Sequence, residues 1–268
     1  MPKSERELRE DIVHIGKLMY GKGWIAANDG NISIRLDNRR ILATPTGVSK
    51  GMMDPDDLII VDNEGNKVAG RLERTSEILM HTTIYELRPD IQSVVHAHPP
   101  VATGFATAGL PLSKAILPEV VIWLGCVPLV EYGLPGTPAL TEPMKPLIPK
   151  YDALLMGNHG AVTYAKDVYQ AFFRMETVEH FARIHFVAEM LGGAKVLPRE
   201  EVAKLLESRG RYGVQSSATA VPGCPTVAED YRESAVGRGN GANGQEGFFV
   251  TREELIQLVE EAVRAKGG

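Results

Sequence analysis

The chain has 268 residues and a formal net charge of −5 at pH 7, with 44% hydrophobic and 24% charged residues. This length can bury a sizeable core in one large or two small domains, and the composition is that of an ordinary globular protein. The acidic balance argues against a nucleic-acid binder, which needs a basic face. Because the sequence shows neither a secretory signal nor a bilayer-spanning apolar run, we expect a cytoplasmic protein with no membrane partner.

Hydrophobic periodicity and turn residues predict helices alternating with short paired strands. In chain order we expect a helix from Ser4 to about Gly21 or Gly23, strands over 32–36, 40–44, 58–61 and 67–69, a helix over about 75–87, a strand over 91–98, a helix over about 102–108, a strand within 120–130 (which contains the apolar run 121–124), strands over 152–156 and 161–164, and a helix from 167 to about 191.

His96 and His98 lie at the end of the strand predicted at 91–98. Side chains alternate faces along a strand, so both imidazoles point to one side and Ala97 to the other. Two imidazoles on one face form two corners of a metal site. An isolated pair of this kind is nevertheless more often two half-buried histidines with ordinary hydrogen bonds.

A third candidate ligand is His159, in the sequence Gly-Asn-His-Gly after the buried strand 152–156. The glycines permit a sharp turn or the close approach of a ligand. Three histidines leave one coordination position open, as a catalytic zinc site requires. Spacing alone leaves open whether His159 meets the other two histidines or is an ordinary turn residue.

Five ordered motifs resemble those of the class II aldolase/adducin family, most closely its L-fuculose-1-phosphate aldolase branch. They are Gly30-Asn31-Ile-Ser, Thr44-Pro-Thr-Gly47, Thr75-Ser76-Glu77, His96-Ala-His98 and Asn158-His159-Gly160, and the similarity covers about residues 5–195. The resemblance implies an α/β fold of three layers, α/β/α, with a mainly antiparallel central sheet. It also implies a homotetramer with active sites at the subunit interfaces.

The resemblance further assigns roles to the residues of these motifs. His96, His98 and His159 would bind Zn²⁺ or another divalent metal. Glu77 would also ligate the metal, and would act as acid and base once the substrate displaces it. The phosphate of a small phosphorylated sugar would be held by Asn31, Thr46, Gly47, Thr75 and Ser76. Helix capping at Thr75 and Ser76, and an ordinary turn at Thr46 and Gly47, are the simpler interpretations of those residues.

The implied reaction is retro-aldol cleavage of a ketose 1-phosphate, such as L-fuculose or L-rhamnulose 1-phosphate. The products would be dihydroxyacetone phosphate and an aldehyde such as lactaldehyde. A tyrosine that handles the proton of the cleaved hydroxyl in related aldolases has no counterpart in residues 117–123, where Glu119 is the nearest polar candidate. His81, one helical turn after Glu77, is a candidate to support that carboxylate.

Three alternatives remain open. A dehydratase or decarboxylase acting on a related sugar phosphate would keep the same three histidines. A 4-epimerase of this family is disfavoured because that branch has Asp where Glu77 stands. An adducin-like, non-enzymatic interaction domain is disfavoured because such a domain should have lost its metal ligands.

The composition changes after about residue 209. We therefore predict a catalytic domain over 1–208, a flexible Gly/Ser/Pro-rich linker over 209–247 and an amphipathic helix over 248–268 that opens with the capping box Thr251–Glu254. Such a tail is similar to the encapsulation peptides that direct enzymes into bacterial microcompartments. We therefore expect a shell protein as partner and a microcompartment lumen as location, with docking on the chain's own tetramer as the alternative.

Overall fold

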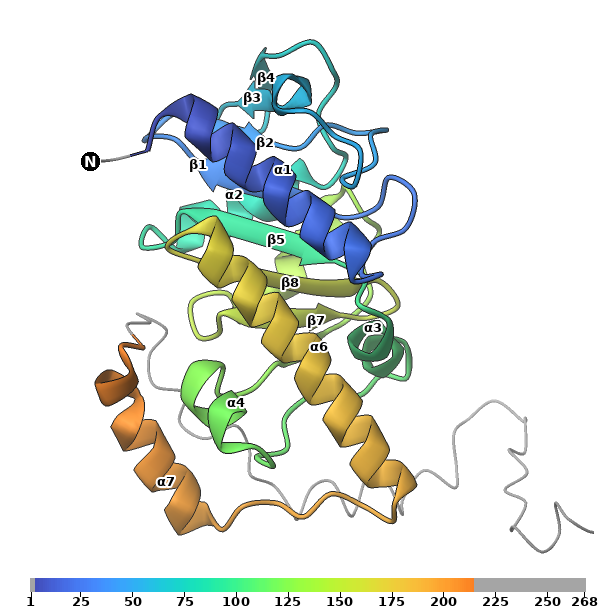
Figure 1. Cartoon of the computed structure of the whole chain (residues 1–268), viewed down its shortest axis with the longest axis vertical. Coiled ribbons are helices and arrows are strands. Elements are labelled where there is room, and N and C mark those ends of the chain that lie inside the picture. The colour runs from blue at the N-terminus through green and yellow to red at the C-terminus, as the bar shows by residue number, and fades with distance from the viewer. Residues whose placement is uncertain (1–2, 215–268) are drawn as a thin grey trace, which may run out of the picture. The chain divides into compact units, whose positions relative to one another are not determined.

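The structure is a computed structural model that describes residues 3–214; the linker from residue 215 onward and the helix predicted at 248–268 lie outside the described residues. Figure 1 shows the arrangement of the elements. In chain order they are α1 (Glu5–Gly21), β1 (Asn31–Arg35), β2 (Ile41–Ala43), η1 (Pro55–Asp57), β3 (Ile59–Val61), β4 (Lys67–Ala69), α2 (Ile78–Leu87), β5 (Ser93–Ala97), α3 (Pro100–Thr107), α4 (Pro118–Trp123), β6 (Leu129–Val130), α5 (Pro138–Thr141), η2 (Glu142–Met144), β7 (Ala153–Met156), β8 (Gly160–Ala165), α6 (Val168–Met190), α7 (Arg199–Ser208) and η3 (Arg209–Tyr212).

One eight-stranded sheet forms the centre, in the order β4-β3-β2-β1-β5-β8-β7-β6. Neighbouring strands are antiparallel except for β6 and β7, which are parallel. The predicted α/β class with a mainly antiparallel sheet is therefore confirmed.

Successive strand residues enter two different hydrophobic cores, as the alternation of a pleated strand requires. On β5, Val95 packs in the core built with α1, α3, α4 and α6, whereas Val94 packs in the core built with α2 and α5. In Figure 1, α1 and α6 cross the near face of the sheet and α2 lies behind it. Helices thus cover both faces, which gives the three layers expected.

The strand predicted within residues 120–130 is confirmed only in part: β6 occupies Leu129–Val130, but the apolar run 121–124 is not a strand. This run lies in α4, which begins with Pro118 at a position that suits proline in a helix. Val120 packs into the main core while Val121 packs against Val202 of α7, so the short helix has apolar contacts on two sides. A continuous apolar run of this kind cannot be told from a buried strand by its pattern alone.

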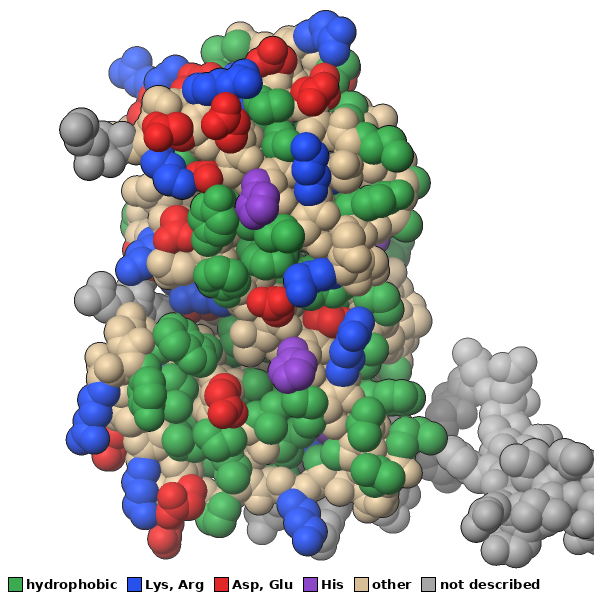
Figure 2. All heavy atoms as spheres, viewed as in Figure 1, with side chains coloured by type: hydrophobic (Ala, Val, Ile, Leu, Met, Phe, Trp, Pro, Cys, Tyr) green, Lys and Arg blue, Asp and Glu red, His purple; other side chains and the backbone are tan. Residues whose placement is uncertain are grey.

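Helix α7 and the short helices η1, α5 and η2 have no counterpart in the prediction, whereas the boundaries of the other elements differ from it by small amounts. Helix α2 begins at Ile78 rather than at Thr75, and residues 209–212 of the predicted linker form the 3₁₀ helix η3. Figure 2 shows that the face covered by α1 and α6 carries interspersed acidic and basic side chains. Among residues 3–214, no helix is both long enough and apolar enough to cross a membrane.

Candidate metal centre and active site

The three candidate histidines converge at one end of the central strands. His96 lies on β5, opposite Asn31 of β1 and Val162 of β8. His98 directly follows β5, and His159 lies in the turn between β7 and β8. The strand pairing therefore joins residues that are more than 60 positions apart in the sequence.

Glu77 completes this cluster from the turn that precedes α2. Its Oε1 lies 2.9 Å from Nε2 of His159 and its Oε2 lies 3.3 Å from Nε2 of His96. The Nε2 atoms of His96 and His98 are 3.2 Å apart, and the ligand atoms of the three histidines all lie within 4.8 Å of one another. The structure thus brings together all four predicted metal ligands.

The donor set fits a tetrahedral divalent metal. Zn–N bonds of about 2.0–2.1 Å in tetrahedral geometry place two nitrogens about 3.3 Å apart, close to the 3.2 Å between His96 and His98. Nδ1 of His96 lies 2.9 Å from the carbonyl oxygen of Ala161, so this nitrogen carries the proton and Nε2 keeps its lone pair for a metal. Oε1 of Glu77 is buried without a hydrogen-bond donor, which leaves it available as a ligand.

The electrostatics of the cluster favour a charged Glu77 and a neutral His98, whereas Glu77 outweighs burial at His96 and raises the pKa of that imidazole. Burial opposes ionisation of Glu77, but the adjacent imidazoles of His96 and His159 outweigh it and hold the pKa of that carboxyl below its usual range. Burial, with the neighbouring charges of His96 and His159, lowers the pKa of His98 to about 4. At neutral pH the carboxylate is therefore charged and His98 is neutral.

Two backbone features hold the histidines close together. A Cβ added at Gly160 would lie 2.5 Å from the carbonyl oxygen of Ala97 and 2.6 Å from Cδ2 of His98, so only glycine fits there. The backbone N–H of His98 donates to the carbonyl of Trp24 at 2.9 Å. The glycine in the Asn-His-Gly motif therefore allows β8 to lie close to the candidate ligands.

Four of the five residues predicted to hold the phosphate lie in two neighbouring segments: Thr46, Gly47, Thr75 and Ser76. The N–H of Thr46 donates to the carbonyl of Glu73 at 3.0 Å, which joins the first segment to the residues just before the second. Thr46, Gly47 and Ser76 are exposed, while Thr75 is buried and its hydroxyl accepts from the N–H of Glu77 at 3.3 Å. The segments thus form an open rim beside Glu77.

Asn31, the fifth of these residues, is placed differently. Its side chain is buried, its Nδ2 donates to Oε2 of Glu77 at 2.7 Å and its Oδ1 lies 2.5 Å from Nε2 of His81. Both halves of the amide are thus engaged inside the protein, with Glu77 on one side and His81 on the other. His81 therefore supports Glu77 through Asn31 rather than by direct contact.

Lys50 is a buried cation that sequence reasoning missed. Only 2% of the residue is exposed, and its ammonium donates to the carbonyl of Asn28 at 2.5 Å. Burial lowers its pKa to about 8, against the opposing influence of Asp29 and Glu77. Lysine is normally a surface residue, so its residue type does not indicate burial. The only signal in the sequence is its position three residues after Gly47.

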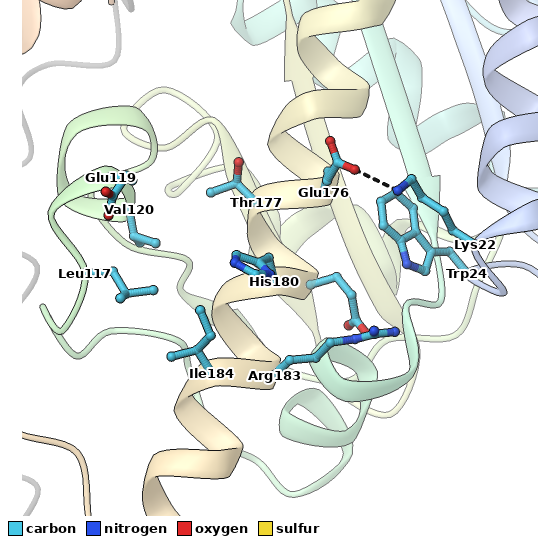
Figure 3. Close-up of a pocket in the computed structure, with 11 residues that line it drawn as sticks. Lys22, Trp24, Leu117, Glu119, Val120, Glu176, Thr177, His180, Arg183 and Ile184 are labelled. Atoms are coloured by element: carbon cyan, nitrogen blue, oxygen red, sulfur yellow. Dashed lines mark hydrogen bonds and ion pairs between the residues drawn. The ribbon is translucent and has the colours of Figure 1, made fainter.

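Glu119 does not join the histidine cluster. It is an exposed residue of α4 that lines a cavity of about 880 Å³ between α4 and α6. Figure 3 shows it across this cavity from Trp24, with His180 and Arg183 projecting from α6. None of the three candidate histidine ligands is among the described residues that line this cavity.

Comparisons with known proteins agree with this geometry. The profile of the Class II Aldolase and Adducin N-terminal domain matches residues 10–186. A 3-oxo-tetronate 4-phosphate decarboxylase of Pectobacterium atrosepticum is 33% identical over 208 residues, covering 75% of this chain and 94% of the relative. An L-fuculose phosphate aldolase of Methanococcus maripaludis is 33% identical over 181 residues, covering 68% and 97%.

A solved structure of an L-fuculose 1-phosphate aldolase superposes with a TM-score of 0.72 and 28% identity, covering 80% of this chain and 98% of the other. The family match spans most of the described residues and includes all four candidate ligands. The chain belongs to the class II aldolase and adducin family.

Proposed function

We propose that the protein is a metal-dependent lyase that cleaves a ketose 1-phosphate, of the L-fuculose or L-rhamnulose type, into dihydroxyacetone phosphate and an aldehyde. The observation that carries this proposal is the convergence of three Nε2 atoms and the Glu77 carboxylate on one point. His96, His98 and His159 would hold the metal together with Glu77, and Zn²⁺ suits this donor set. A divalent ion there supplies Lewis acidity toward the substrate's carbonyl and adjacent hydroxyl oxygens.

Glu77 has the position and the charge to move a proton. When the carbon–carbon bond breaks, the carbon that stays with the dihydroxyacetone phosphate fragment gains a proton. A buried carboxylate beside the ligands can carry it. The rim formed by Thr46, Gly47, Thr75 and Ser76 offers hydroxyl groups and exposed backbone for the phosphate of the same fragment.

A second candidate reaction is the decarboxylation of a 3-oxo-tetronate 4-phosphate. Loss of CO₂ from that β-keto acid, followed by protonation of the same carbon, also yields dihydroxyacetone phosphate. Retro-aldol cleavage needs a group that takes the proton of the cleaved hydroxyl, whereas decarboxylation of an ionised acid does not. The absence of a tyrosine from residues 117–123 specifically favours this candidate, as does a relative with that name at 33% identity.

One assay separates the two reactions. Release of dihydroxyacetone phosphate would be followed from L-fuculose and L-rhamnulose 1-phosphates, and from 3-oxo-tetronate 4-phosphate with a CO₂ trap, on zinc-loaded and chelated protein. Metal-dependent release from a ketose phosphate supports the aldolase, and release accompanied by CO₂ supports the decarboxylase. A metal-loaded protein that releases the product from none of these substrates would refute both.

The proposal extends to assembly as a homotetramer. Glu119 lies apart from the ligands of its own chain, so its predicted role as acid or base requires that it reach the site of a neighbouring copy. Light scattering tests the tetramer. Activity recovered on mixing inactive Glu77→Gln and Glu119→Gln proteins would support a site shared between subunits.

A further inference from the structure

Asn31, His81, Ser33 and Tyr85 form a buried hydrogen-bond ladder that ends on Glu77. Nδ2 of Asn31 donates to Oε2 of Glu77 at 2.7 Å, and Oδ1 of Asn31 lies 2.5 Å from Nε2 of His81. Nδ1 of His81 lies 2.7 Å from Oγ of Ser33, and Oγ of Ser33 lies 2.8 Å from the hydroxyl of Tyr85. At most 4% of any of the four ladder residues is exposed.

The periodicities of two elements place these residues in register. Glu77, His81 and Tyr85 are spaced four apart, so they share one face of α2 and of the turn that leads into it. Asn31 and Ser33 are spaced two apart on β1, so they share the sheet face that α2 covers. The strand residues therefore interleave with the helix residues, which produces the ladder.

Each hydrogen bond of the ladder has only one consistent direction. A charged carboxylate only accepts, so Asn31 turns its NH₂ toward Glu77 and presents its oxygen to His81. Nε2 of His81 must then carry a proton. Burial and the nearby charge of His96 lower the pKa of His81 to about 3, so its ring is neutral and its Nδ1 accepts from the Ser33 hydroxyl. Ser33 in turn accepts from Tyr85 at 2.8 Å, which is closer than the 3.4 Å between the same hydroxyl and the carbonyl oxygen of Gln92, so every donor of the ladder points toward Glu77.

We propose that this ladder is the positioning apparatus of Glu77, with His81 as its central positioning residue. It holds Oε2 on a fixed donor and leaves Oε1, which has no donor, directed at the three histidines. The ladder thereby sets which carboxylate oxygen the metal site receives. This inference rests on the proposed function, because it assigns a purpose to the orientation of Glu77.

The test measures Co²⁺ binding, which needs no substrate. Wild-type protein would be compared with His81→Leu, which removes the donor to Asn31, and with His81→Gln, whose amide nitrogen can take the place of Nε2. Tyr164→Phe is the matched control, because Tyr164 is another fully buried tyrosine of the same core, and its hydroxyl donates to the carbonyl of Ile148 outside the ladder. The readouts are the Co²⁺ dissociation constant against a competing chelator and the visible spectrum of bound Co²⁺.

We expect His81→Leu to bind Co²⁺ about tenfold more weakly and with an altered spectrum, as when a group that orients a ligand is lost. His81→Gln should restore both readouts, and Tyr164→Phe should leave both unchanged. Wild-type affinity and spectrum in His81→Leu, or the same loss in Tyr164→Phe, would overturn the inference.

Two further outcomes are also decisive. If His81→Leu does not fold, Tyr85→Phe carries the test, because it deletes only the hydroxyl that begins the ladder. Weaker Co²⁺ binding by Tyr85→Phe then supports the inference, and wild-type binding overturns it. A wild-type protein that takes up no Co²⁺ would refute the proposed function itself and this inference with it.

Discussion

Glu77 touches two kinds of partner through its two oxygens. Oε2 accepts from Asn31 and approaches His96, whereas Oε1 faces His159 without a donor of its own. A side chain that only balanced charge would have no need of such unequal surroundings. The arrangement suits a carboxylate that is held at one oxygen and is free to bind or exchange a proton at the other.

The Glu77→Gln variant should therefore fold normally and lose most of its catalytic activity. We expect kcat to fall by about 10²- to 10⁴-fold, the usual contribution of a positioned acid or base. Steady-state release of dihydroxyacetone phosphate measures this effect, and circular dichroism checks the fold. Glu73→Gln is the control, because Glu73 is an exposed carboxylate of the same segment that pairs with Lys67. Equal activity in wild type and Glu77→Gln would remove Glu77 from the mechanism.

The buried Lys50 should make the free energy of unfolding depend on pH. Its pKa is about 8 in the folded protein and 10.5 without perturbation, so between these values the unfolded chain binds more protons. The free energy of unfolding should then rise with pH by about 1 kcal/mol per unit in this window, with the cost of burying the charge fully present below pH 8. Lys50→Met should lack this rise.

Urea unfolding of chelated protein between about pH 8 and about pH 10 measures this contribution within the window set by the two pKa values. The comparison is the difference in unfolding free energy between wild type and Lys50→Met at each pH. Lys17→Met, at an exposed position of α1, is the control. A wild-type minus Lys50→Met difference that does not change with pH would contradict the prediction.

At the scale of elements, α6 supports the candidate metal site through Glu179. This carboxylate is 2% exposed and accepts from the N–H groups of Val101 at 3.1 Å and Ala102 at 2.9 Å, at the start of α3. Helix α3 has no side-chain cap of its own, so Glu179 satisfies N–H groups that a helix start leaves unpaired. Because α3 begins two residues after His98, the same contact anchors the chain that follows that ligand.

Replacing Glu179 with Ala should lower both stability and metal affinity. Leaving buried N–H groups without an acceptor costs about 1–3 kcal/mol in unfolding free energy. Glu176→Ala, one turn earlier on α6, removes only a half-exposed ion pair with Lys22 and should cost about 1 kcal/mol or less. Chemical denaturation and Co²⁺ titration provide the two readouts. Comparable losses of stability and of Co²⁺ affinity in the two variants would contradict this role of Glu179.

The contacts between elements also explain why the sequence predicts some features of the site and not others. Local signals were sufficient for the strand that carries His96 and for the turn that carries His159. The face shared by Glu77, His81 and Tyr85 is readable from their spacing, but its contact with Asn31 depends on the register of β1 against α2. Lys50 is buried only because α1 packs over the chain around it, with Gly16 against its backbone, and no local pattern encodes that contact.

At the scale of the whole molecule, the described residues form the hydrophobic core of the predicted catalytic domain. The three hydrophobic clusters described here are built from residues between Leu8 and Leu206. If residues 248–268 form a separate tail, as the sequence predicts, deleting them should leave the unfolding temperature and the release of dihydroxyacetone phosphate unchanged. If the tail is an encapsulation peptide, the same deletion should abolish co-sedimentation with microcompartment shells.

Co-sedimentation assays of full-length and shortened protein with purified shells would measure this effect. Shells that retain the shortened protein would rule out the encapsulation role. A loss of tetramer in light scattering would instead support the alternative, in which the predicted helix docks on its own assembly.

The order of the central strands also has a consequence for the time at which the site forms. Strands β1, β5 and β8 are neighbours in the sheet, yet residues 36–92 and 98–159 separate them along the chain. Contacts of such long range form slowly, because the intervening loops must close first. A chain emerging from the ribosome lacks its last candidate ligand until His159 has been made, and lacks the strand that positions this ligand until β8 ends at residue 165. A metal held by these residues would therefore be taken up after folding, and would stabilise a chain that has already found its native strand pairing.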